Sequence, residues 1–263
     1  MARVAVAATA PFGADVLERL AARHDVTFLL TRPDRPAGRG RRVTAPPAKQ
    51  VAERLGITVR QPERLDDWFE VPEEPIVIAA YGALIPTPLL ELGRWLNVHP
   101  SLLPRWRGAA PVERALMAGD LESGVTIHKT TPELDAGPIA AQRTFAIAPD
   151  DDAGAVYAKA AEVAVELLDD VLSGEPEFRP QEGEPTYAMK IGPEDRELDL
   201  SRPQDALNRV RALSPHIGAR AELQGRPVIV WRARVEDGKF VPVEVQPEGR
   251  RRMSYEEFLR GLR

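Results

Sequence analysis

The chain has 263 residues, of which 43% are hydrophobic, so it can bury the core of one large domain or of a domain with a small appendage. It contains no cysteine, which excludes disulfide bonds and thiolate zinc sites and suits the cytoplasm. The N-terminus shows no signal-peptide pattern, and no apolar run is long enough to span a bilayer. We therefore expect a cytoplasmic protein that does not associate with membranes.

The net charge of −5 hides one strongly basic stretch. Residues 31–50 hold six Lys or Arg residues against a single acid, Asp34. Within this stretch, residues 31–42 contain two prolines and two glycines, which predicts an exposed loop rather than a helix or an interior strand. Most charged loops are only solvated surface, but a long loop with one sign of charge also favours an anionic partner.

The first half of the chain alternates strand and helix patterns, which predicts a parallel sheet of α/β type. The run 75–80 is entirely apolar, as is typical of a central strand. The turn after the first strand lacks the Gly-x-Gly-x-x-Gly pattern, so the fold is expected to be Rossmann-like in architecture but not to bind a dinucleotide there. The elements predicted by this pattern are strands at 4–8, 26–30, 57–60 and 75–80 and helices at 14–23 and 47–55.

Two later segments complete the predicted architecture. Apolar positions between 152 and 172 follow helical spacing closely and predict a long helix. The Pro- and Gly-rich residues 173–193 are interpreted as a linker. Beyond them we predict a helix at 203–213, short strands at 219–223, 228–233 and 240–245, and a final helix at 254–260. The predicted domains are accordingly 1–172 and a small β-rich domain at 194–263.

The chemistry is concentrated on the strand that begins at Trp95. Asn97, His99 and Ser101 alternate along it, so their side chains are expected to share one face. A helix is predicted at 112–117, and a polar cluster at a strand end before a turn and helix is where α/β enzymes tend to keep their active sites. Taken alone, the pattern also fits a capped strand end with one structural histidine.

A second segment favours catalysis. The strand 126–129 is followed by a Gly- and Pro-bounded loop that carries Asp135, where a carboxylate can be held rigidly. His128 lies within that strand and is interpreted as structural. The motif Asn-x-His-Pro-Ser-Leu-Leu-Pro (97–104), with Leu-Asp-x-Gly-Pro (134–138) downstream, resembles the folate-dependent formyltransferases. Over almost its whole length the chain is similar to the methionyl-tRNA formyltransferase family.

This resemblance implies both a fold and a reaction. The fold is α/β, with a Rossmann-like, mostly parallel sheet followed by a small OB-like domain, which is expected to be abridged here because only about 30 residues follow Val235. The reaction is transfer of the formyl group of 10-formyltetrahydrofolate to the amino group of methionyl initiator tRNA. We expect no association with a membrane, and the resemblance implies no protein partner. No metal is expected, since the formyl group is already activated.

The resemblance also assigns roles to individual residues. Asn97 and His99 would donate hydrogen bonds to the formyl oxygen, and Asp135 would orient His99 and accept the proton of the amine. Folate binding is expected from Ser101, Leu102, Leu103 and Pro104, and from the backbone around Tyr81 and Leu84. The basic loop resembles the tRNA-contacting loop of the family, and the residues expected to contact tRNA are Arg35, Arg39, Arg41, Arg42 and Lys49.

Two other reactions remain open at this point. A sugar-nucleotide N-formyltransferase would share Asn97, His99 and Asp135, but it would be expected to lack the arginine-rich loop. A 10-formyltetrahydrofolate hydrolase would use the same three residues to activate water and would need no basic loop.

Overall fold

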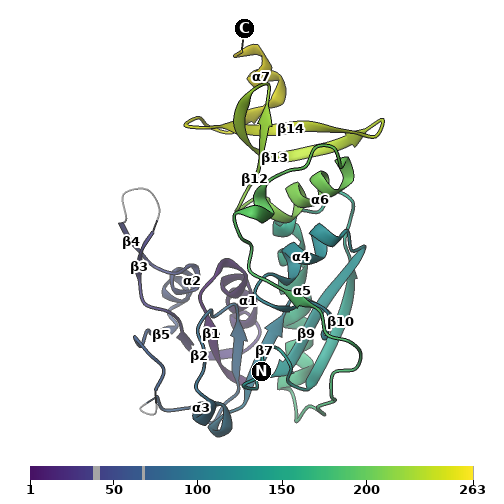
Figure 1. Ribbon diagram of the computed structural model, residues 1–263. Helices are drawn as coiled ribbons and strands as arrows, with labels where there is room; N and C mark the ends of the chain where they lie inside the picture. The colour runs from purple at the N-terminus through teal and green to yellow at the C-terminus, as the bar shows by residue number, and fades with distance from the viewer. Residues whose placement is uncertain (38–41, 67–68, 263) are drawn as a thin grey trace. The chain divides into compact units, whose positions relative to one another are not determined.

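The computed structural model describes residues 1–37, 42–66 and 69–262. The described chain forms two compact units, each built from several segments (Figure 1). The first unit consists of Met1–Arg107, Gly124–Thr144 and Ala158–Thr186, and the second of Gly108–Ser123, Phe145–Tyr157 and Tyr187–Arg263. The proposed boundaries at 172 and 194 stay a prediction, because these units follow spatial contacts rather than chain order.

A seven-stranded sheet dominates the first unit in the described part of the chain. β1 pairs in parallel with β2 and β6, β2 with β5, and β6 with β7, while β7 and β9 are antiparallel. The predicted mostly parallel sheet is therefore confirmed. Across the sheet the strands are β10 (Ile139–Ala146), β9 (Glu122–Lys129), β7 (Trp95–His99), β6 (Ile76–Ala79), β1 (Arg3–Ala8), β2 (Asp25–Leu30) and β5 (Thr58–Arg60).

The helices follow the apolar patterns closely. α1 (Pro11–Ala21) begins three residues earlier than predicted, because proline suits the first turn of a helix. α2 (Pro47–Leu55) has the predicted bounds and ends at Gly56, whose φ of 72° is the left-handed conformation common at helix ends. α5 (Ala153–Leu172) is the long helix that the spacing predicts. A short helix not predicted from the sequence, α3 (Thr87–Leu92), precedes β7.

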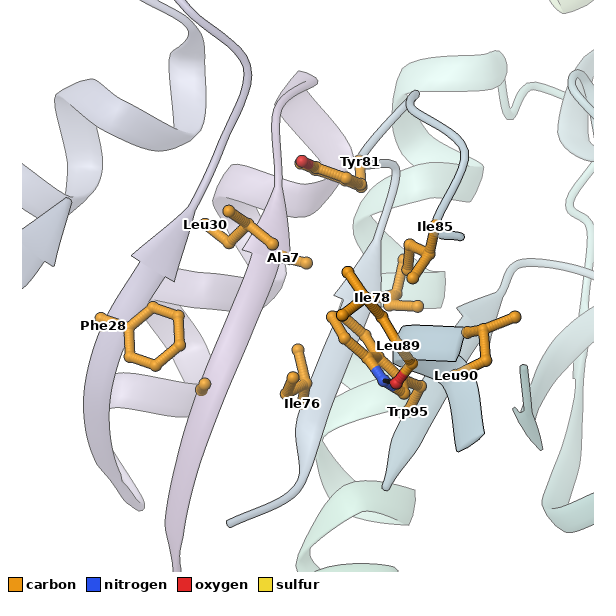
Figure 2. Close-up of a cluster of buried hydrophobic side chains, with 11 residues drawn as sticks. Ala7, Phe28, Leu30, Ile76, Ile78, Tyr81, Ile85, Leu89, Leu90 and Trp95 are labelled. Atoms are coloured by element: carbon orange, nitrogen blue, oxygen red, sulfur yellow. Dashed lines mark hydrogen bonds between the residues drawn. The ribbon is translucent and has the colours of Figure 1, made fainter. Parts of the chain in front are cut away.

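A buried cluster anchors the start of β7 (Figure 2). Trp95 is 1% exposed and packs with Ile76 and Ile78 of β6 and with Leu89 of α3. Its indole Nε1 donates a 2.7 Å hydrogen bond to the Leu89 carbonyl, so its polar atom is satisfied inside the core. Burying each such side chain contributes roughly 1.5–3 kcal/mol. The first residue of the strand that carries Asn97 and His99 is thus held firmly.

The basic stretch is partly a hairpin, which corrects the expectation of a loop throughout. β3 (Arg35–Ala37) and β4 (Arg42–Thr44) pair antiparallel, with Arg35 opposite Thr44. Both strands of an isolated ribbon are edges, so a proline such as Pro36 can sit in one of them without breaking a ladder.

The second unit contains the predicted β-rich C-terminal part. In its described residues an antiparallel sheet runs in the order β12 (Ala219–Leu223), β13 (Arg226–Glu236), β14 (Lys239–Pro247) and β15 (Met253–Ser254). α6 (Pro203–Leu213) and α7 (Tyr255–Arg260) cover its core through Val210, Leu213 and Phe258. Ser254 caps α7 by accepting a hydrogen bond from the Glu257 backbone N–H.

This unit also includes residues from the middle of the chain. α4 (Pro111–Ala118) buries Val112 and Leu116 in one cluster with Val156 and with Ala212 of α6. The C-terminal part therefore shares its core with residues 108–123 and 145–157. The remaining short elements are β8 (Arg107–Gly108), β11 (Tyr187–Ala188) and a 3-10 turn at Glu194–Arg196.

Within the residues described, none of the helices combines the length and the apolar character required to cross a membrane.

Candidate active site

Strand β7 presents Asn97 and His99 on one face, as the alternation predicts. In the antiparallel pairing with β9, His128 lies opposite Asn97 and Thr126 lies opposite His99. Directly opposite residues of such a pair have neighbouring side chains on the same face. His128 therefore joins Asn97 and His99 in one cluster. Sequence alone could not show this, because the register between β7 and β9 is a property of the folded sheet.

His128 is held as a neutral imidazole. Its Nδ1 lies 3.0 Å from the Lys129 carbonyl, so Nδ1 carries the hydrogen, and Nε2 accepts a 3.1 Å hydrogen bond from Asn97 Nδ2. Burial, helped by the neighbouring His99, lowers the pKa of His128 from 6.5 to about 4. At neutral pH it therefore acts as a fixed acceptor that orients the Asn97 amide.

The second hydrogen of the Asn97 amide points at Asp135. Asn97 Nδ2 lies 3.2 Å from Asp135 Oδ1, and turning the amide over would place its oxygen against the carboxylate. Both N–H groups of Asn97 are thus directed at His128 and Asp135. For the predicted hydrogen bond to a formyl oxygen, one of these contacts has to be exchanged.

His99 is oriented by a backbone carbonyl rather than by Asp135. Its Nε2 donates a 2.8 Å hydrogen bond to the Trp106 carbonyl, which leaves Nδ1 facing Asp135 Oδ2 at 3.7 Å. The ring is only 4% exposed, so its position is set by packing as well as by this hydrogen bond. Nδ1 is consequently the atom that can take part in chemistry, with a carboxylate near enough to stabilise an imidazolium.

The Asp135 loop depends on close backbone approach. Asp135 has a φ of 46°, in the left-handed region, and its side chain is 12% exposed. A Cβ at Gly137 would collide with the Lys129 carbonyl, so only glycine lets the loop lie against the end of β9. The Lys129 N–H donates to the Pro138 carbonyl at 2.9 Å and closes the loop. The carboxylate is thereby held rigidly, as the sequence predicts, and it lies beside the neighbouring strand β7.

Comparison with known proteins identifies the family of the chain. Residues 2–172 match the model of the formyl transferase family. The methionyl-tRNA formyltransferase of Methylococcus capsulatus is 38% identical to the chain, over 98% of this chain and 96% of that protein. The chain belongs to the methionyl-tRNA formyltransferase family.

Solved structures with low sequence identity share the fold of this family member. The methionyl-tRNA formyltransferase of Clostridium thermocellum has a TM-score of 0.66 at 16% identity, over 94% of this chain and 99% of that one. HypX of Aquifex aeolicus, in complex with tetrahydrofolic acid, has a TM-score of 0.65 at 19% identity, over 98% of this chain and 48% of that one. The formyltransferase fold predicted from the sequence is confirmed.

The residues expected to bind folate in this formyltransferase follow β7 or border it. The Ser101 hydroxyl donates to the Arg105 carbonyl at 2.7 Å, so it closes the turn after the strand. Leu103 is buried, and its N–H donates to Thr126 Oγ1 at 3.1 Å. Leu102 and Pro104 are half-buried. The turn therefore offers a ligand backbone groups and apolar side chains. Folate contact by all four residues stays a prediction.

The second expected folate segment contains opposite environments. Tyr81 packs into the cluster of Figure 2, and its burial raises the pKa of the phenol. Leu84, three residues later, is 90% exposed. An exposed leucine in a loop beside a buried tyrosine is suited to an apolar ligand, and the folate role of this segment stays a prediction.

The residues expected to contact tRNA are only partly described. Arg35 is exposed on β3, Arg42 lies on β4, and Arg39 and Arg41 fall outside the described residues. Lys49 of α2 is already paired, with Nζ 2.8 and 2.9 Å from the two carboxylate oxygens of Asp34. Hydrogen bonds from Gln61 and Lys49 hold the pKa of Asp34 below its usual value. Asp34 therefore neutralises part of the charge of Lys49.

Two further groups at the site were missed by sequence reasoning. One is the Trp106 carbonyl that orients His99, and the other is Gln181, whose amide lies against the Asp135 loop. Neither carries a sequence signal, because a backbone carbonyl looks the same everywhere and Gln181 lies in a stretch with the composition of a linker. Within the described ranges, no group of His, Cys, Asp and Glu side chains is arranged to hold a metal ion.

Proposed function

We propose that this protein transfers the formyl group of 10-formyltetrahydrofolate to the amino group of methionyl initiator tRNA, for translation initiation. The observation that carries the proposal is the cluster of half-buried Asn97, buried His99 and half-buried Asp135, which resembles in sequence the catalytic motif of the family to which the chain belongs. A cytoplasmic location is part of the proposal, since it follows from the tRNA substrate.

The chemistry begins with attack by the neutral amine on the formyl carbon. A C–N bond forms, negative charge develops on the formyl oxygen, and the bond between the formyl carbon and the folate nitrogen then breaks. His99 bearing a proton on Nδ1 would donate to that oxygen, with Asp135 stabilising the imidazolium. Preorganised donors of this kind are usually the largest catalytic contribution, and losing one costs on the order of 10²–10³ in rate.

Asp135 has a second proposed task, which is to receive the proton that the amine loses. Its Oδ2 faces His99 and its Oδ1 is held by Asn97, so the carboxylate is oriented from both sides. The proton would pass to it directly or through one water and then leave on the folate nitrogen. Asn97 would exchange its contact with Asp135 or His128 for the formyl oxygen when substrate binds.

The proposed substrate surfaces follow from the same resemblance. Folate would lie along Ser101–Pro104 and beside Tyr81 and Leu84. HypX, which shares the fold and was solved in complex with tetrahydrofolic acid, supports a folate-type ligand. The tRNA would contact the hairpin through Arg35, Arg39, Arg41 and Arg42, with Lys49 behind it. Arginines bind phosphate well because the guanidinium presents several donors in a fixed plane.

One comparison of substrates tests the proposal. We would measure formyl transfer from 10-formyltetrahydrofolate to methionyl initiator tRNA, to methionyl elongator tRNA, to an amino-sugar nucleotide and to water, released as formate. Preferred transfer to the initiator tRNA is expected. Faster transfer to the sugar amine, or formate release unaffected by tRNA, would replace the proposal by a sugar-nucleotide formyltransferase or by a hydrolase.

A further inference from the structure

The segment Arg179–Thr186, named here the strap, contacts both loops that hold His99. It lies in the stretch with linker composition, and it is irregular rather than helical, apart from a single bridge at Arg179. Its backbone pairs with Ile139 through hydrogen bonds of 2.7 and 3.0 Å between Ile139 and Arg179. Farther along, the Thr186 carbonyl accepts from the Arg107 N–H at 2.8 Å. All of these residues belong to the first compact unit.

The two residues that flank His99 are both in strained conformations. Trp106, whose carbonyl binds His99 Nε2, has a φ of 64°, and Asp135, which faces His99 Nδ1, has a φ of 46°. A residue other than glycine in the left-handed region costs of order 1–3 kcal/mol and persists only where its surroundings enforce it. Something must therefore hold each of them in place.

The strap supplies a side-chain hydrogen bond to each strained residue. Thr186 Oγ1 accepts from the Trp106 N–H at 2.9 Å. Gln181 Nε2 donates to the Asp135 carbonyl at 2.8 Å and to the Gly137 carbonyl at 2.9 Å. One short segment thus contacts the backbone of both residues between which the imidazole of His99 is set.

The orientation of Gln181 is itself determined. Its Oε1 accepts from Arg107 Nε at 3.1 Å and from Arg107 Nη2 at 2.7 Å. An arginine can only donate, so the amide oxygen must face Arg107 and both amide hydrogens must face the Asp135 loop. Arg107 directly follows Trp106, so this hydrogen-bond network joins the two strained loops through Gln181.

We infer that the strap sets the catalytic geometry of His99 and Asp135, with Gln181 and Thr186 as positioning residues that contact no substrate. This inference rests on the proposed function, because it assigns the two residues to the formyl-transfer site. It predicts an effect on turnover rather than on substrate binding, since neither residue belongs to the proposed folate or tRNA surfaces. A misplacement of about 1 Å at a catalytic group can cost on the order of 10²-fold in rate.

The experiment compares steady-state kinetics of strap variants. Gln181→Glu keeps the acceptor for Arg107 but replaces the donor with an oxygen that faces two carbonyls. We expect its kcat to fall roughly 10–100-fold, with KM for folate and tRNA changed less than about threefold. Thr186→Val should lose about tenfold, and Thr186→Ser, which keeps the hydroxyl, should recover most of the loss. If Gln181→Glu does not fold, the comparison of Thr186→Val with Thr186→Ser still tests the inference.

Gln246→Glu is the matched control. Gln246 makes the same kinds of contact, accepting from Trp231 Nε1 at 3.1 Å and donating to the Arg250 carbonyl at 2.9 Å, but it lies in the second unit. Its kcat should stay at the wild-type value. If Gln246→Glu lost as much kcat as Gln181→Glu, the strap would act only by stabilising the fold, and the inference would be overturned.

A double variant separates this inference from the proposed function. If the strap acts through Asp135, adding Gln181→Glu to Asp135→Asn should cause little further loss, whereas independent effects would multiply. Three results would overturn the inference while the enzyme still formylates tRNA. They are losses in kcat that multiply in the double variant, a change confined to KM, and wild-type kcat in all strap variants. Absence of transfer by the wild-type protein would instead refute the proposed function.

Discussion

The proposed catalytic cluster and the basic hairpin differ in how far their side chains are exposed and fixed in orientation. His99 and His128 are 4% and 1% exposed, and the hydrogen bonds of both rings and of the Asn97 amide assign each a definite orientation. The hairpin β3–β4 instead leaves Arg35 exposed and Val43 69% exposed. Chemistry at one carbon atom requires directed donors, whereas contact with a phosphate backbone requires accessible charge.

This difference shows where each region is sensitive to substitution. A change of one atom in the cluster removes a directed hydrogen bond that nothing else can replace. On an exposed hairpin each positive charge adds a similar amount to the binding of a phosphate backbone, and salt weakens this attraction.

Replacing Asp135 by Asn should nearly abolish formyl transfer. The amide cannot accept the proton of the amine and cannot stabilise an imidazolium on His99, so we expect a loss of about 10³-fold in kcat or more. His99→Ala should behave similarly. Asp135→Asn should unfold near the wild-type temperature in a thermal melt, whereas His99→Ala should stay folded but melt at a lower temperature, because it empties a buried site and removes the donor to the Trp106 carbonyl. A folded Asp135→Asn enzyme with wild-type turnover would contradict the assignment of the cluster.

His128 should make the stability of the protein depend on pH. Its folded pKa of about 4 lies below its usual 6.5, so between these values the unfolded chain binds more protons and the free energy of unfolding falls as the pH falls from 6.5 to 4. The full difference corresponds to roughly 3 kcal/mol. In His128→Gln, which cannot titrate, urea unfolding should lose this part of the pH dependence. An unchanged slope would show that another group is responsible.

Neutralising the hairpin should weaken tRNA binding without impairing chemistry. With Arg35, Arg39, Arg41 and Arg42 changed to Gln, we expect KM for tRNA to rise about tenfold at moderate salt and the salt slope of binding to fall by roughly 0.7–0.9 per lost contact. Folate KM and kcat should hold. Arg3→Gln and Arg143→Gln, on other elements of the first unit, serve as controls. Unaltered kinetics with tRNA would show that the hairpin is only solvated surface and does not contact tRNA.

The smallest effect is expected at Lys49. Its ammonium is half-buried and paired with both oxygens of Asp34, so less of its charge is available to a phosphate. Lys49→Met should change KM for tRNA by about twofold, compared with a larger change for Arg35→Gln. A Lys49 effect as large as that of Arg35 would show that tRNA displaces Asp34 from this lysine.

Local sequence was sufficient for most elements of the fold. The bounds of α2 and α6 and of strand β12 were predicted to the residue, because their proline starts, glycine turns and apolar spacing are local signals. The hairpin at 35–44 was missed, since its pairing depends on how the two short strands meet. The long strands β13 and β14 were underestimated for the same reason, because their outer residues are held by strand pairing, Glu236 with Lys239 of β14 and Arg226 with Leu223 of β12.

Division of the chain into units was decided by tertiary packing. Sequence composition places a linker at 173–193. In the structure the residues up to Thr186 group with the first unit, those from Tyr187 group with the second, and α4 packs with α6 in the second. A Pro- and Gly-rich stretch lacks regular structure, but it can still follow a surface closely. Composition therefore predicts the lack of regular structure, but it does not predict whether the stretch packs against a surface.

The sequence by itself determined which residues we propose to carry the chemistry, because the alternation of Asn97 and His99 and the turn around Asp135 are local patterns. It also determined the parallel sheet and the basic character of the hairpin. Only the tertiary structure decided that His128 orients Asn97, that the Trp106 carbonyl orients His99 and that Gln181 holds the Asp135 loop. The physical reason is that each of these hydrogen bonds joins chain segments whose mutual position is set by strand register and loop packing, which no local pattern encodes.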